Sequence, residues 1–183
     1  MKKSGFIVFL LGLGALRASA QVPFPVEEGT RKITYTEVVT IDKVKKGELL
    51  KRAQSWAAGG QYAPAKQQVA DQYQCRGQVK VSYPSITAGK TDKGLVTYSA
   101  AVYCKDGKYK YVLTDFSHQG LDGRGDGGAL ENSTPACGKF ILSLASWNKI
   151  KEQTHAEAEN AVASLKAALE KGPAPPAKKP TDF

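Results

Sequence analysis

The segment Val96–Ser117, VTYSAAVYCKDGKYKYVLTDFS, decides the fold of this chain. On both sides of Asp106-Gly107, apolar and polar side chains alternate, as they do in strands with one buried face. Asp-Gly favours a tight hairpin turn, because Gly and Asp tolerate the positive φ angles that such a turn requires. The segment therefore predicts an antiparallel hairpin with these cross-strand pairs: Cys104 with Tyr109, Val102 with Tyr111 and Ala100 with Leu113.

The flanking sequence extends this hairpin into a sheet accompanied by helices. Apolar periodicity and the positions of Gly and Pro predict, in chain order, a strand over Lys32–Ile41, a helix over Gly47–Ala58, a strand over Tyr73–Tyr83, a loop over Gln119–Lys139 and a helix over Leu144–Glu170. Both helices are amphipathic, so each needs an apolar surface to cover. The predicted fold class is α+β, a single antiparallel sheet of four to five strands with the two helices packed on one face.

The first 20 residues have the features of a secretory signal peptide. Lys2 and Lys3 precede an apolar run over Gly5–Leu16, and Ala18-Ser19-Ala20 is a small-residue cleavage site. We therefore expect a periplasmic or secreted protein, with no transmembrane segment in the mature chain because no later apolar stretch is long enough. The expected domains are a signal peptide over 1–20, an α+β domain over 21–171 and a disordered Pro/Lys-rich tail over 172–183.

The charge balance is moderately basic, which is compatible with anionic partners. The sequence has 26 Lys and Arg against 17 Asp and Glu, and removal of the signal peptide leaves 23 against 17, a net charge of +6. An anionic envelope component is one class of partner that fits this excess, and a protein partner is another. Surface lysines that only maintain solubility are the alternative explanation.

Three cysteines enter an oxidising compartment if the protein is exported. With Tyr83 opposite Val96, Cys75 falls opposite Cys104 on the buried face, at a spacing that a disulfide can close. The sequence thus predicts a Cys75–Cys104 disulfide and leaves Cys137 unpaired. Two buried free thiols are the alternative.

The predicted sheet has a second face, opposite the helices, on which basic and aromatic side chains alternate. Its candidate binding residues are Arg76, Lys80, Tyr103, Lys110, Phe116 and His118. Such a surface can hold anions and stack planar groups. A solvated polar face is the alternative, since antiparallel sheets often leave one face in water.

No catalytic or metal-binding pattern is present in the sequence. Ser117 and Asp115 alternate with His118 along the strand, so these side chains lie on opposite faces and cannot form a triad. The histidines and cysteines have no zinc spacing, and Asp122, Asp126 and Glu131 lack the spacing of a calcium loop. Arg124-Gly125-Asp126 matches an adhesion tripeptide, which chance alone often produces. We expect no cofactor, no metal and no catalytic residue.

Several separated segments resemble one family. The shared residues are Pro25, Val26, Lys32, Ile33, Tyr35 and Thr36 near the N-terminus, Tyr109, Tyr111, Thr114, Asp115, Phe116, Ser117 and His118 in the hairpin, and Trp147 and Ile150 in the last helix. They are similar to an uncharacterised family of exported Bacteroidetes-type proteins, a domain of unknown function with a fold like one repeat of the TATA-binding protein. The resemblance implies a curved antiparallel sheet and no function, and it leaves open a further strand near Gln67–Asp71. DNA is not an expected partner of an exported protein.

These observations give one leading hypothesis and two rivals. The leading hypothesis is a non-enzymatic envelope or secreted binding module that uses the open sheet face and the Gln119–Lys139 loop. The first rival is a periplasmic enzyme with dispersed catalytic residues. A cleft lined by several titratable groups would support this hypothesis. The second is a purely structural envelope protein.

Overall fold

The computed structural model describes residues 23–60, 62–65 and 69–172. Its elements are β1 (Tyr35–Thr40), α1 (Lys46–Ala58), β2 (Tyr62–Pro64), β3 (Gln72–Pro84), β4 (Thr91–Lys105), β5 (Lys108–Gly120), β6 (Gly128–Ala129) and α2 (Leu144–Lys171). All pairings are antiparallel, and the six-stranded sheet has the order β1-β5-β4-β3-β2, with β6 added to β5. The α+β prediction is confirmed.

The β4–β5 hairpin forms as its sequence predicts. Gly107 has a φ of 75°, and all three predicted cross-strand pairs are present. A turn that accepts only a few residue types fixes where the two strands meet, and the pairs from Lys105–Lys108 to Ser99–Thr114 follow from it.

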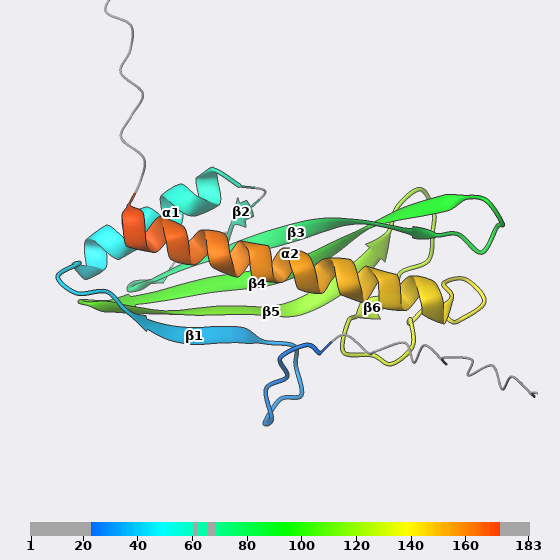
Figure 1. Cartoon of the computed structure of the whole chain (residues 1–183), viewed down its shortest axis with the longest axis horizontal. Helices are drawn as coiled ribbons and strands as arrows, with labels where there is room; N and C mark the ends of the chain where they lie inside the picture. The colour runs from blue at the N-terminus through cyan, green and yellow to red at the C-terminus, as the bar shows by residue number, and fades with distance from the viewer. Residues whose placement is uncertain (1–22, 61, 66–68, 173–183) are drawn as a thin grey trace, which may run out of the picture.

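Both helices lie within a few residues of their predicted limits and cover one face of the sheet (Figure 1). The Ser143 hydroxyl accepts a hydrogen bond from the backbone N–H of Ser146 and so caps the start of α2. Gly172, with a φ of 76°, directly follows the last residue of this helix. α2 runs along the sheet with one buried stripe, while α1 contacts α2, β3 and β4. The largest fully buried side chains include Trp147, Tyr109, Phe116, Leu49, Leu113, Ile150, Leu165 and Leu169.

The register between β3 and β4 differs from the prediction. Cys75 pairs with Ala100 instead of Cys104, and Tyr83 pairs with Asp92 instead of Val96, a displacement of four residues. The displacement arises because β4 begins at Thr91, directly after a short turn, whereas the sequence suggested a longer connection. An even displacement keeps every side chain on its predicted face, so alternation alone cannot detect it.

An irregularity in β5 places Phe116 and His118, which were predicted on the open face, in the core. The β4–β5 register shifts between Thr97 and Ser99, and across from it Asp115 has a φ of 60°. The extra residue reverses which face the following side chains occupy, as a β-bulge does. Phe116 and His118 are each 1% exposed, so their predicted place on the open face is wrong.

The segment predicted as one long loop is partly regular. β5 continues to Gly120, and β6 pairs with Ser117 and His118 of β5. Leu130 is buried, which ties the segment to the core.

Residues 1–20 lie outside the described residues, as do residues 173–183 of the predicted tail. β2 lies at Tyr62–Pro64, and of the predicted further strand near Gln67–Asp71 the described residues 69–71 are not in a strand. Within the described part of the chain, no helix has the length and apolar character needed to cross a membrane.

Candidate functional site

The surface of the sheet opposite the helices, called the open face below, is rich in cations. Alternation along β3, β4 and β5 places there Arg76, Lys80, Lys93, Lys105, Lys108 and Lys110. Among the described residues, none of these cations is within 4.0 Å of a carboxylate, although ion pairs occur elsewhere in the chain. The nearest acid along β5, Asp115, is paired with Lys32. The open face therefore has several positive charges that no carboxylate of the described residues compensates.

The observed register changes which predicted residues are neighbours on the open face. Tyr103 pairs directly with Lys110, as predicted. Arg76 instead lies opposite Ser99, whose own partner is Thr114, and Lys80 lies opposite Leu95. The cations are thus spread along the sheet rather than gathered in one row with Tyr103.

A hollow of about 610 Å³ lies on the open face beside β2. Its lining combines Arg76 and Tyr103 with small or apolar side chains such as Ala101 and Val112. The Cys75 side chain is buried on the opposite, covered face of the sheet, so its thiol is not available to a ligand in this hollow. An arginine and a tyrosine supply recognition groups but no acid–base pair.

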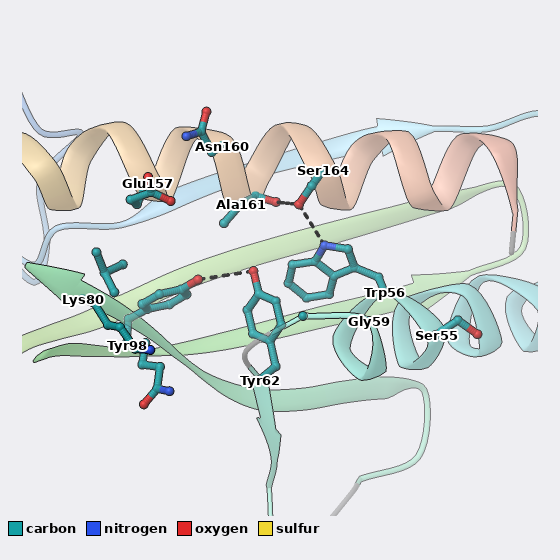
Figure 2. A pocket seen from close by; sticks show the side chains of 13 residues that line it. Ser55, Trp56, Gly59, Tyr62, Lys80, Tyr98, Glu157, Asn160, Ala161 and Ser164 are labelled. Atoms are coloured by element: carbon teal, nitrogen blue, oxygen red, sulfur yellow. Dashed lines mark hydrogen bonds between the residues drawn. The ribbon is translucent and has the colours of Figure 1, made fainter. Parts of the chain in front are cut away.

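A second concavity, of about 650 Å³, lies where the C-terminal end of α1 meets β2, β3 and α2 (Figure 2). Trp56 and Tyr62 pack with ring centroids 4.2 Å apart, and Tyr98 meets Tyr62 edge-on at 6.5 Å. Two glycines leave room for these rings. A Cβ at Gly77 would lie 2.3 Å from the Tyr98 ring, and a Cβ at Gly60 would lie 2.6 Å from the Tyr62 ring.

The polar groups of this second concavity mostly bind one another. The Trp56 indole N–H donates to the Ser164 hydroxyl at 3.0 Å, and the Tyr98 hydroxyl donates to that of Tyr62 at 3.4 Å. Burial raises the pKa of both tyrosines, so neither is a base near neutrality. The strand β2, which the sequence did not predict at this position, brings Tyr62 to Trp56.

His118 is a structural residue of the core. Its Nδ1 accepts a hydrogen bond from the backbone N–H of Gly127 at 3.1 Å, and its ring packs against Tyr83 and Trp147. Burial lowers the pKa of His118 to about 4. The neutral ring then has its proton on Nε2, which has no hydrogen-bond partner among the described residues. A neutral, enclosed imidazole cannot contact a ligand on the open face.

A chain of three titratable side chains, which the sequence did not reveal, joins β1 to α2. The Tyr35 hydroxyl lies 2.6 Å from Nδ1 of His155, and Nε2 of His155 lies 3.5 Å from Glu159. Burial raises the pKa of Tyr35, which is only 8% exposed, and Phe24 packs edge-on against His155. The arrangement resembles an acid–base relay, but its terminal hydroxyl is enclosed, which favours a structural role.

The predicted disulfide is wrong. All three cysteines are described, and each is a free thiol. Cys75 and Cys104 are buried at separate positions along the sheet, because the four-residue displacement puts Ala100 opposite Cys75. Burial raises the pKa of both thiols to about 11, which makes them poor nucleophiles.

Charged residues of the Arg124-Gly125-Asp126 tripeptide and of the predicted acidic set make contacts within the protein. Arg124 pairs with Asp92 at 3.0 Å, and an Asp126 carboxylate oxygen accepts the Gly120 N–H at 3.0 Å. Glu131 accepts the Ile33 N–H at 2.9 Å. These contacts hold the loop to the sheet, and no group of three or more His, Cys, Asp or Glu suited to a metal ion occurs within the described ranges.

Comparison with known proteins identifies the fold. Residues 35–119 match the family described as "Domain of unknown function (DUF4468) with TBP-like fold". A DUF4468 family protein from Bacteroides ovatus ATCC 8483, solved by crystallography, is similar over 82% of this chain and 94% of its own, with a TM-score of 0.58 and 15% identity. A TBP-like protein from Parabacteroides distasonis ATCC 8503 is similar over 80% of this chain and 97% of its own, with a TM-score of 0.59 and 19% identity. No curated protein matches the chain in sequence. At these identities the solved structures establish the fold alone.

Proposed function

We propose that the chain is an exported, non-enzymatic binding protein whose open face holds an anionic envelope component. The observation that carries this proposal is the set of cations on that face without carboxylate partners among the described residues. Export rests on the signal-like sequence of residues 1–20.

The shape of the open face supports binding rather than catalysis. Its hollow is bordered by Arg76 and Tyr103, which donate hydrogen bonds and offer an aromatic surface. Lys105, Lys108 and Lys110 continue the positive surface toward the hairpin turn, as a long polyanion would require. A protein partner with an acidic surface is the second class of ligand that suits these charges.

An enzymatic function has one observation in its favour, the contact of Tyr35 with His155 and Glu159. An enzyme that used this group would need the Tyr35 hydroxyl to reach a substrate, but Tyr35 is only 8% exposed and its hydroxyl is hydrogen-bonded to His155 of α2. We therefore propose the binding function ahead of it.

Titration with heparin, a soluble polyanion, tests the proposal. The double substitution Arg76→Glu with Lys110→Glu should weaken binding at least tenfold and flatten its dependence on salt, because unlike charges attract less as ionic strength rises. The matched control is Lys43→Glu with Lys51→Glu, which changes the same charge at exposed positions outside the strands. Equal losses in both variants, or no binding by the unmodified protein, would reject the open face as the site.

A further inference from the structure

One end of the molecule displays apolar side chains that the fold does not use. Phe140 is 96% exposed, and Ile141 and Leu144, next to it in the chain, are 52% and 41% exposed. Ile86, in the turn between β3 and β4, is 58% exposed. Single exposed apolar residues are ordinary, but a phenylalanine with almost no contact beside other exposed apolar residues marks an interaction surface.

These residues lie at the same end of the molecule. The Ser146 hydroxyl, in the first turn of α2, donates to the carbonyl of Pro84 at 2.7 Å, so the start of α2 is fixed to the end of β3. Figure 1 shows the β3–β4 turn and the loop before α2 at the end of the sheet away from α1. We call residues Ile86, Lys90, Lys139, Phe140, Ile141 and Leu144 the apical tip.

The loop that carries Phe140 is anchored to the core and stabilised by backbone hydrogen bonds. Leu142 is 3% exposed and anchors the loop in the core. The backbone N–H groups of Ile141 and Leu142 both donate to the carbonyl of Gly138 at 3.1 Å. On the inner side, a Cβ at Gly125 would lie 2.6 Å from Ile141, so the glycine lets Ile141 rest on the loop beneath it. Phe140 is thus presented on a fixed support, which reduces the entropy lost on binding.

The charges around the apical tip are mainly positive. Lys90 and Lys139 belong to no ion pair within the described residues, and neither does Lys93 nearby. Two neighbouring acids are already neutralised, Asp92 by Arg124 and Glu152 by Lys149. The adjacent loop also has two exposed acids, Asp122 and Asp126, and a carboxylate oxygen of Asp126 accepts the Gly120 N–H.

We propose that the apical tip docks on a lipid bilayer with anionic headgroups. Phe140, Ile141 and Ile86 would enter the boundary between headgroups and acyl chains, where apolar burial supplies the attraction. Lys139 directly precedes Phe140, and Lys90 belongs to the same β3–β4 turn as Ile86, so both exposed lysines are near these residues in the chain and would meet the negative surface potential. Apolar side chains accompanied by lysines match this surface better than they match a protein groove, because a bilayer accepts both classes of group together.

This docking is independent of the proposed polyanion site, since the apical tip shares no residue with the Arg76 and Lys110 region. Docking at the apical tip would leave the open face available to a ligand. Failure of either proposal would therefore not reject the other.

Vesicle co-sedimentation tests the inference. The chain without residues 1–20, a removal that leaves every described contact intact, should bind vesicles of phosphatidylglycerol and phosphatidylcholine more tightly than vesicles of phosphatidylcholine alone. Phe140→Ser with Ile141→Ser should lower the partition coefficient about tenfold or more, because burial of even one large apolar side chain changes it by that factor. Val38→Ser, at a 61% exposed position on β1, is the matched control and should change little.

Thermal stability, fluorescence quenching and heparin binding of the variants separate a loss of docking from a loss of folding. The thermal midpoint of the double serine variant should fall by only a few degrees, since Phe140 is 96% exposed and Ile141 is half-exposed. In F140W, brominated lipids should quench the added fluorescence relative to the parent. Heparin binding by the double serine variant should remain unchanged. Absent binding to anionic vesicles, binding unaffected by the serine substitutions, or no quenching in F140W would each overturn the inference.

Discussion

The two faces of the sheet differ in how their polar groups are satisfied. On the face beneath the helices, aromatic and aliphatic side chains surround polar groups that mostly bind one another, as Tyr62 and Tyr98 do. On the open face, the cations have no carboxylate partners among the described residues. The proposed function thus assigns stability to the covered face and binding to the open face, so substitutions should separate the two properties.

Removal of the Trp147 side chain should have the largest effect, because it opens a cavity in the covered face. Trp147 is fully buried, and its indole N–H donates to the carbonyl of Asn132 at 3.0 Å. Trp147→Ala should lower the free energy of unfolding by about 3–5 kcal/mol in urea titrations. A loss no larger than that caused by an open-face substitution would contradict the division between the faces.

Acid should destabilise the covered face through His118. The pKa of His118 is lowered to about 4 in the folded protein, against 6.5 for an ordinary histidine. Between these values the unfolded chain binds a proton that the folded chain does not, so stability is present above pH 6.5 and falls as the pH drops toward 4. The loss should reach about 3 kcal/mol, with each pH unit contributing up to about 1.4 kcal/mol.

Unfolding titrations across this pH range provide the measurement. His118→Gln keeps a hydrogen-bond acceptor but cannot take up the proton, so it should remove this part of the pH dependence. His155→Gln is the matched control, because it alters the other histidine of the described chain. An unchanged pH profile in His118→Gln would show that another group causes the acid sensitivity.

A smaller effect should follow from filling the space that the aromatic cluster uses. Gly77→Ala would set a Cβ 2.3 Å from the Tyr98 ring, which is 4% exposed and has little room to move. The expected cost is about 1–3 kcal/mol in the free energy of unfolding. Gly47→Ala is the control, since no atom lies within 4 Å of its added Cβ. It should be neutral or slightly stabilising in helix α1.

The smallest effect on stability should come from the open face itself. Arg76→Ala with Lys110→Ala should change the free energy of unfolding by less than about 0.5 kcal/mol, because exposed charges contribute little. The same variant should bind heparin more weakly. A large loss of stability would mean that these cations serve the fold instead.

The sequence predicted those parts of the fold whose signals are local. Asp106-Gly107 specified the β4–β5 pairs, and apolar spacing with terminal glycines located both helices. It failed where a distant contact decides the outcome. Nothing near Pro84 revealed that β4 begins at Thr91, so the β3–β4 register and the Cys75–Cys104 pairing were wrong.

The candidate site was predicted in part for the same reasons. Arg76, Lys80, Tyr103 and Lys110 lie on the open face, because face alternation is a local property of strands. Phe116 and His118 do not, because the bulge at Asp115 reverses the alternation that precedes it. A tight β-bulge leaves no reliable mark in a single sequence, although the adjacent Asp at a positive φ is a residue type that tolerates it.

Backbone amide chemical shifts during titration with heparin test the central claim most directly. If the open face is the binding surface, the largest changes will map to β3, β4 and β5 around Arg76, Tyr103 and Lys110. Residues of the covered face, such as Ala158 and Leu165 on α2, will change little. Changes concentrated on the helices, or spread evenly over the surface lysines, would contradict the claim.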